Sequence, residues 1–426
     1  MNDEALRQLG DVRIGPDTKG MPIDAVGGTV AELVAARRPL FGGGFTAPVM
    51  VLHAEALTHN LALMARYCRD SGVELAPHGK TTLAPQLFAR QLAEGAYGIT
   101  AATGSQLRLY RAFGVPRVLV ANQIVDRVTL AWLRTELETA SDFDVICYVD
   151  SPATVALLAD EFTGAPPGGR LPVLIEVGHS GGRTGCRTLA QVQEVATAVA
   201  AAPGLRLAGV AAFEGTIGPP GQPGVRERVR DFLAHVRDAG EWLVSRGLVP
   251  DGLMLSAGGS AYFDLVVAAF RHGWPSEQPV RVVLRSGCYA VHETGPPADG
   301  TPFAFSPYRG EVLRPALELW GQVLSRPEPE LAVLGFGKRD ASFDTAMPTP
   351  VRLRRADATA AEPFTGARIE GLNDQHAYLR LPAGHRLEVG DWVGCGLAHP
   401  CTAFDKWRLI PVVVDDVVVD CVHTFF

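Results

Sequence analysis

The chain has 426 residues, a formal net charge of −7, 47% hydrophobic residues and 20% charged residues. These values predict a soluble globular protein of two or three domains with a large buried core. The acidic balance, with arginine clusters only as short as the one at 352–355, argues against nucleic acid as a partner. The chain contains no run of about 18 apolar residues, so the sequence predicts no membrane span. The N-terminus lacks the layout of a signal peptide.

Seven cysteines are scattered along the chain without the spacing of a zinc finger. An odd number of unclustered cysteines is typical of a reducing compartment rather than of a disulfide framework. The sequence therefore predicts a cytoplasmic protein.

The elements predicted in chain order begin with a strand and a helix between residues 48 and 72. Short apolar runs that end in small or polar residues then recur, with helix-compatible segments such as 105–114 and 188–202 between most of them. The runs are VELAPHGK (73–80), GITAAT (98–103), RVLVANQ (117–123), DVICYVDS (144–151), PVLIEVG (172–178), AGVAAFEG (208–215), GLMLSAGG (252–259) and VRVVLRSG (280–287). Eight strands that alternate with helices predict a (β/α)8 TIM-like barrel; a doubly wound open sheet is the alternative.

The pattern changes near residue 300 to alternating strands that turn at glycine and asparagine. We expect the barrel to end there, so that 46–300 forms the barrel and 301–426 a mostly antiparallel β domain. Residues 1–45 are expected to pack with that β domain. The Gly/Pro-rich stretch 215–226 is too long for a simple turn and predicts a loop within the barrel.

Lysine is rare, since it supplies only four of the 39 basic residues, at positions 19, 80, 338 and 406. Lys80 follows the first repeating strand, at the rim where the catalytic groups of such barrels collect. Its neighbours Ala76, Pro77 and Gly79 are small or apolar. A partly desolvated lysine can form a Schiff base with an aldehyde cofactor or a carbonyl substrate. The alternative is an ordinary solvated lysine.

Two glycine-rich strand ends, 256–260 and 285–289, are candidates for binding a phosphate through backbone N–H groups. Tight turns without a ligand are the alternative. The candidate cofactor-binding residues at these ends are Ser256, Gly258, Gly259, Ser260, Arg285, Gly287, Cys288 and Tyr289. Arg183 also follows a strand, and we expect it either to face a cofactor or substrate carboxylate or to cap a loop.

A possible metal site lies in the segment 396–407. His399 and Cys401 are two residues apart, so on an extended chain they point to the same side. Imidazole and thiolate together suit Zn²⁺, and so few protein ligands would leave positions open, as in a catalytic site. His376 is ambiguous, because the residues before it also read as a turn.

Together these stretches resemble the D-serine dehydratase and D-threonine aldolase group of alanine-racemase-like, fold-type III pyridoxal-phosphate (PLP) enzymes. The motifs that carry the resemblance are APHGKTT (76–82), GITAATGSQ (98–106), RVLVANQIV (117–125), SAGGS (256–260), NDQHA (373–377) and HPCTAFDKWR (399–408). They are most similar to bacterial D-serine deaminase-like proteins. The resemblance implies a PLP-binding barrel, a β domain and a homodimer. It also implies that Lys80 forms the Schiff base with PLP and that His399 and Cys401 bind a divalent metal, Zn²⁺ first and Mn²⁺ second.

The resemblance implies an ammonia-lyase that converts a D-3-hydroxy amino acid such as D-serine into a 2-oxo acid and ammonia. Retro-aldol cleavage to glycine and an aldehyde is the alternative, although aldolase relatives tend to have aspartate where Cys401 stands. A PLP carrier and a racemase are further alternatives. The chain departs from many relatives at Thr82 and Leu83, where a histidine and a lysine are common, and in the stretch 286–294.

Overall fold

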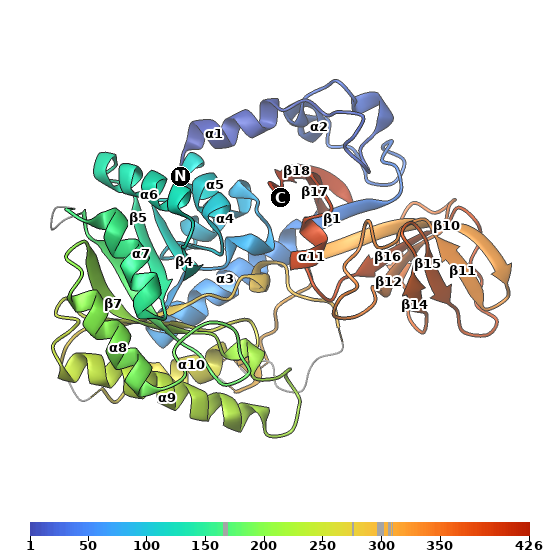
Figure 1. Cartoon of the computed structure of the whole chain (residues 1–426). Coiled ribbons are helices and arrows are strands. Elements are labelled where there is room, and N and C mark those ends of the chain that lie inside the picture. Colours follow the sequence, from blue (N-terminus) through green and yellow to red (C-terminus); the bar gives the residue numbers. More distant parts are fainter. Residues whose placement is uncertain (165–168, 275–276, 296–301, 306–307, 309) are drawn as a thin grey trace.

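The computed structural model describes residues 1–164, 169–274, 277–295, 302–305, 308 and 310–426. It contains two sheets. The first is parallel and is surrounded by helices, and the second is mostly antiparallel and is built chiefly from the C-terminal part of the chain (Figure 1).

The parallel sheet has the strand order β2-β9-β8-β7-β6-β5-β4-β3. Its strands are β2 Glu74–Leu75, β3 Ile99–Ala101, β4 Arg117–Gln123, β5 Asp144–Val149, β6 Leu171–Val177, β7 Leu205–Ala212, β8 Leu253–Ala257 and β9 Val280–Leu284. The first and last strands of this order also meet. The N–H of Tyr97 donates to the carbonyl of Leu75 at 2.7 Å, and the N–H of Thr100 donates to that of Pro77 at 2.8 Å. The sheet therefore curls on itself and closes as a barrel.

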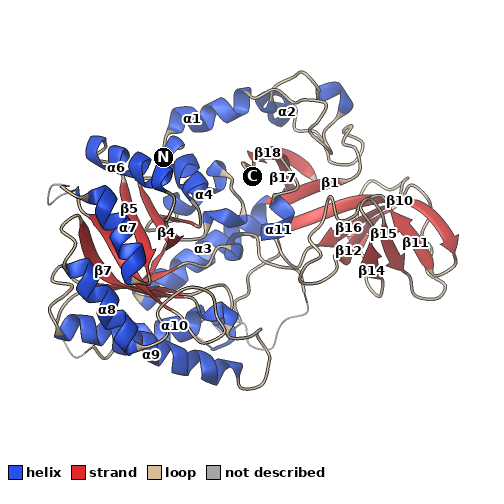
Figure 2. Ribbon diagram, in the orientation of Figure 1, coloured by secondary structure: helices blue, strands red, loops and turns tan. Residues whose placement is uncertain are grey.

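Helices cover the outside of the barrel (Figure 2). They are α3 Ala54–Ser71, α4 Pro85–Ala93, α5 Gly104–Ala112, α6 Arg127–Thr139, α7 Pro152–Phe162, α8 Leu189–Ala200, α9 Val225–Ser245 and α10 Phe263–Phe270. Several begin at a residue whose side chain accepts a hydrogen bond from the first turn, as at Thr103, Asp126 and Thr188. The apolar residues of α3 face the core, with Leu57 and Met64 both inaccessible to solvent.

Side chains fill the inside of the barrel, so the barrel is a packed core and not a channel. The interior cluster consists of Ala76, Leu119, Ile146, Tyr148, Leu174, Ala208, Ala211, Met254 and Val283. Gly209 shows how closely β7 and β8 approach each other. A Cβ at this position would lie 1.9 Å from the carbonyl oxygen of Met254, and the φ of Gly209 is +148°. Only glycine fits there.

The second sheet runs in the order β13-β12-β16-β10-β1-β17-β18, with β11, β15 and β14 continuing from β10. Its strands are β1 Val49–His53, β10 Leu317–Glu328, β11 Leu331–Leu334, β12 Thr349–Arg354, β13 Glu362–Pro363, β14 Arg368–Leu372, β15 Ala377–Arg380, β16 Trp392–Gly396, β17 Leu409–Val414 and β18 Val417–His423. Strand β1 precedes the barrel in sequence but pairs with β10 and β17. The barrel sheet itself thus begins at β2.

The N-terminal segment packs against this second sheet. Its helices are α1 Asp3–Gln8 and α2 Val30–Ala35, and the 3-10 turns η1 Leu9–Asp11 and η2 Ile23–Ala25 lie between them. The ring of Phe41 meets those of Trp320 and Trp392 edge-on, at centroid distances of 4.9 and 5.7 Å. Leu40 donates its N–H to the carbonyl of Asp416, next to β18. Aromatic contacts of Phe41 and a backbone bond of Leu40 therefore attach the N-terminal segment to the β domain.

The predicted fold class is confirmed: the eight apolar runs form the eight barrel strands, and a mostly antiparallel sheet follows them. The barrel, and not the open sheet, is the architecture. Every helix among the described residues is too short or too polar to cross a lipid bilayer.

Asn60 of α3 joins the barrel to the segment that leads into β10. This fully buried side chain donates to the carbonyls of Ala290 (3.1 Å) and Arg314 (2.7 Å) and accepts from the N–H of Arg314 (2.7 Å). We expect Asn60→Ala to lower the free energy of unfolding by about 3 kcal/mol, because it leaves buried backbone groups without partners. Chemical denaturation measures this. Gln8→Ala, which removes only an exposed hydrogen bond to Glu4, is the control and should change stability little.

Candidate active site

The carboxyl ends of the barrel strands surround a cavity of about 320 Å³. Its lining residues are His78, Lys80, Thr81, Ala102, Ala121, Asn122, Tyr148, Glu176, Arg183, Thr184, Phe213, Gly259, Ser260, Arg285, Gly287, Cys288 and Cys401. All but Cys401 come from the barrel or the loops at its rim. Most of the residues predicted from the sequence therefore meet in one place, although far apart in the chain.

Lys80 lies in the short turn η3 (Gly79–Thr81), directly after the closing edge of the barrel. A Cβ on Gly79 would lie 2.5 Å from the hydroxyl oxygen of Tyr110, so the turn depends on glycine at this position. The Lys80 side chain is half-buried and lines the cavity. Among the described residues it has no carboxylate partner, whereas Lys19 pairs with Asp340 at 2.8 Å. The amine is thus placed in the cavity without an ion pair to hold it.

Three buried polar atoms at this cavity have no hydrogen-bond partner among the described residues: His78 Nδ1, the Tyr148 hydroxyl and Arg285 Nε. Buried polar atoms without partners are rare and point to a polar ligand. Burial and the nearby cations, Lys80 first, hold the pKa of His78 well below its ordinary value. Burial raises the pKa of Tyr148 to about 12. The donor groups available here, with Lys80 among them, fit a cofactor that has an aldehyde, a ring nitrogen and an anionic group.

Arg285 is held rigidly at the base of the cavity. Its guanidinium donates to the hydroxyl of Ser256 at 2.7 Å and to the carbonyl of Ala212 at 2.6 Å. Ser256 in turn donates to the carbonyl of Val283 at 3.1 Å. The predicted residue Ser256 therefore orients Arg285 and does not line the cavity. Its role as a direct cofactor ligand stays a prediction.

The other predicted residues of the glycine-rich ends divide between two environments. Gly259, Ser260, Gly287 and Cys288 line the cavity. The buried Tyr289 instead accepts a hydrogen bond from Gln91 at 3.4 Å and lines a neighbouring, more apolar hollow.

The backbone N–H groups of Gly258 and Gly259 already have a partner, Glu214. They donate to its two carboxylate oxygens at 3.2 and 2.7 Å. Glu214 is fully buried and begins the turn η5 (Glu214–Thr216) after β7. This residue was not predicted from the sequence. The available signal was an acidic residue directly after an apolar strand, AGVAAFEG.

Arg183 lies at the edge of the cavity, with its guanidinium 4.7 Å from the ring centroid of Phe213. This stacking holds an exposed side chain over the opening. The buried Glu176 also lines the cavity, and its carboxylate accepts a hydrogen bond from Gln123 at 2.7 Å. A cation at the opening and a fixed carboxylate inside give the cavity a polarity that an amino acid can match.

Cys401 lines the cavity from the β domain and begins the short helix α11 (Cys401–Phe404), and His399 lies two residues before it. The Cys401 sulfur lies 3.3 Å from the hydroxyl oxygen of Thr81 and 3.3 Å from the sulfur of Cys288. Asp344 accepts a hydrogen bond from His399 Nδ1 at 2.6 Å. A carboxylate behind a histidine in this way fixes the ring of a metal-binding imidazole.

Electrostatics within this group favour a thiolate and a charged imidazole. The hydrogen bond with Cys288 is the main cause that lowers the pKa of Cys401, and the bond with His399 adds to it. The pKa of His399 is raised to about 9 by the bonds of its ring to Cys401 and Asp344. No group of three or more His, Cys, Asp or Glu side chains converges tightly enough for a complete metal site in the part of the chain that the structure describes. The donor pair thus fits a metal only if other ligands, such as water or substrate, complete the shell.

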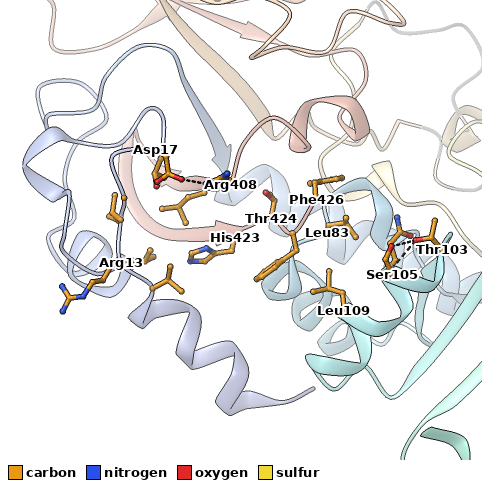
Figure 3. Close-up of a pocket in the computed structure, with 18 residues that line it drawn as sticks. Arg13, Asp17, Leu83, Thr103, Ser105, Leu109, Arg408, His423, Thr424 and Phe426 are labelled. Atoms are coloured by element: carbon orange, nitrogen blue, oxygen red, sulfur yellow. Dashed lines mark hydrogen bonds and ion pairs between the residues drawn. The ribbon is translucent and has the colours of Figure 1, made fainter. Parts of the chain in front are cut away.

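His376 lies in the exposed turn between β14 and β15, where its carbonyl accepts from the N–H of Asn373 at 2.9 Å. The residues before His376 had indicated such a turn from the sequence. A larger hollow of about 860 Å³, between the N-terminal segment, α5 and the C-terminus, contains none of the predicted catalytic or metal-binding residues (Figure 3). Its ionic group, Asp17 with Arg408, lies at one edge.

Comparison with known proteins shows the family to which the chain belongs. Residues 52–270, more than half of the chain, match the model "Alanine racemase, N-terminal domain", and residues 316–413 match "Putative serine dehydratase domain". The chain belongs to this family of fold-type III PLP enzymes. The domain matched first contains Lys80, and the second match includes His399 and Cys401.

Individual members of the family have low sequence identity to this chain. D-threonine aldolase of Arthrobacter sp is 25% identical over 375 residues, which are 88% of this chain and 90% of that protein. 3-Hydroxy-D-aspartate aldolase of Paracoccus denitrificans (strain Pd 1222) is 26% identical over 71% of this chain and 74% of that protein. Among solved structures, D-threo-3-hydroxyaspartate dehydratase from Delftia sp. HT23 superposes with a TM-score of 0.69 at 20% identity, covering 89% of this chain and 98% of that one.

The contact between His399 and Asp344 gives a direct test of the site. We expect Asp344→Asn to lower the pKa of His399 from about 9 toward the ordinary 6.5 in metal-free protein, because the variant removes an anion that stabilises the charged ring. The bond with Cys401 should keep the pKa of His399 above 6.5. An NMR titration of the ring measures the change. Asp374→Asn, an equal change of charge at an exposed carboxylate, should leave the titration of His399 as it was.

Proposed function

We propose that the chain is a PLP- and metal-dependent lyase of D-3-hydroxy amino acids, and that it eliminates the β-hydroxyl of a substrate such as D-serine to give a 2-oxo acid and ammonia. One observation carries this proposal. Lys80 and Cys401 line the same cavity, and the sulfur of Cys401 lies 3.3 Å from the hydroxyl of Thr81, the residue next to Lys80. A base and a metal donor can therefore act on one small molecule.

PLP bound in this cavity would supply an electron sink, and a Zn²⁺ or Mn²⁺ ion held by His399 and Cys401 would supply a Lewis acid. The amine of Lys80 moves the proton of Cα. Arg183, stacked on Phe213 at the opening, is placed to bind the α-carboxylate.

Further side chains around the site support this reaction. His78 stays neutral next to Lys80, because its pKa is held low, and so adds no further positive charge. Asp344 keeps the His399 ring in one orientation.

Retro-aldol cleavage to glycine and an aldehyde is the second candidate, and the names of the curated relatives favour it, since both are aldolases. Cleavage requires a base that takes the proton of the β-hydroxyl. Thr82 and Leu83, which stand where many relatives have basic residues, have no basic side chain, and neither lines the cavity. Together with Cys401 in place of aspartate, this favours elimination. The metal donors favour a lyase over a PLP carrier, and we also propose a homodimer on the basis of the resemblance.

A product analysis decides between the two lyase reactions. We expect purified protein supplied with PLP and Zn²⁺ to convert D-serine into pyruvate and ammonia in equal amounts, with no glycine. D-Threonine and D-3-hydroxyaspartate complete the panel. Lys80→Ala should abolish turnover, because no other described amine lines the cavity. Glycine and aldehyde as the main products would instead establish an aldolase, and racemised D-alanine without either product set would contradict a lyase.

Removal of the metal tests the role of the β domain. We expect a chelator to reduce turnover by roughly 100-fold while the absorbance of bound PLP remains, because the metal would be held by His399 and Cys401 of the β domain and the cofactor by residues of the barrel. His399→Ala should have the same effect, and His376→Ala, an equal change in an exposed turn, should have none. Full activity after exhaustive chelation would rule out metal assistance.

A further inference from the structure

The buried carboxylate of Glu214 occupies the backbone donors that the sequence assigned to a phosphate. Both of its oxygens accept N–H groups, from Gly258 at 3.2 Å and from Gly259 at 2.7 Å. A phosphate carries up to two negative charges, and it cannot share these donors with a buried carboxylate without strong repulsion. Either Glu214 leaves when the cofactor binds, or it stays and serves another purpose.

The carbonyl side of the same turn is fixed as well. The Ser286 hydroxyl donates to the carbonyl oxygens of Gly258 (3.2 Å) and Gly259 (3.0 Å), and the N–H of Arg285 donates to the Gly258 carbonyl at 3.1 Å. Gly258 has a φ of +93°, which disfavours any other residue. The turn is therefore held from both sides, and the removal of Glu214 would leave the buried N–H of Gly258 and the half-buried N–H of Gly259 without this partner.

The neighbouring donors, in contrast, are free to bind a ligand. In the described part of the chain, the backbone N–H groups of Ser260 and Cys288 donate no hydrogen bond to the protein. Both residues line the cavity. Cys288 begins the turn η6 (Cys288–Ala290), whose first N–H groups have no partner within the turn.

We propose that Glu214 is a positioning residue that stays in place and braces the turn Gly258–Gly259, so that the next donors, those of Ser260 and Cys288, receive the anionic group of the cofactor. The inference rests on the proposed function only in taking PLP as the ligand. Glu214 then acts on the affinity for the phosphate without contacting it.

Cofactor binding to Glu214→Gln tests this, measured by absorbance titration of cofactor-free protein. Glutamine keeps one acceptor but turns an amide donor toward a backbone N–H, which loosens the turn. We expect the Kd of PLP to rise about 10- to 100-fold, the effect of losing one buried hydrogen bond to a charged group. The Kd of pyridoxal, which lacks the phosphate, should change little.

The sign of the change separates the two roles. If Glu214 competes with the phosphate, Glu214→Gln will bind PLP more tightly than the natural chain, and this would overturn the inference, as would an unchanged Kd. Ser286→Ala, which weakens the brace from the carbonyl side, should also weaken PLP binding and keeps the test open if the first variant does not fold. Glu227→Gln, an exposed change of the same type on α9, is the matched control. A natural chain that binds no PLP at all would refute the proposed function instead.

Discussion

The candidate site depends on contact between the two halves of the molecule, above all on that of Thr81 with Cys401 at 3.3 Å. The first residue belongs to the turn that carries Lys80, and the second belongs to the β domain. Other bonds keep the two halves in this relation: the N–H of Phe425 donates to the carbonyl of Leu83 at 3.0 Å, and Gln86 of α4 donates to the carbonyl of Cys421 at 3.4 Å. A shift of about 1 Å between the halves would separate the amine from the metal donors, and catalysis is sensitive to displacements of that size.

Much of the fold could be predicted because barrel strands carry a strong local signal. Each is a short apolar run that ends in small or polar residues, and these ends form the rim. The partners of β1 had no such signal, since an apolar strand looks alike in either sheet. What decides its place is aromatic packing over long distances in sequence, in which Val49 and Val51 share a buried cluster with Trp320. The positions of the loops at the strand ends could be predicted for the same reason, because each loop begins where an apolar run ends.

The candidate site was predictable in part. Lys80 and the pair His399 and Cys401 are conspicuous by residue type and spacing, but their supporting residues are not. Asp344 lies 55 residues before the histidine that it orients, and Glu214 lies 44 and 45 residues before the glycines that it holds. Such partners are selected by tertiary contact and leave no periodic pattern. Groups that perform chemistry are therefore easier to predict from a sequence than groups that position them.

The charge of the cavity differs from that of the chain. The protein has a net charge of −7, yet Lys80, Arg183 and Arg285 line the cavity against one carboxylate, Glu176. Glu214 also lies below this surface, but its two oxygens already accept backbone N–H groups. Within low-dielectric walls, this excess of cations attracts anions more strongly than the same charges would in water. A phosphorylated cofactor and an amino-acid carboxylate are both anions, so one electrostatic feature of the barrel rim suits both ligands of the proposed reaction.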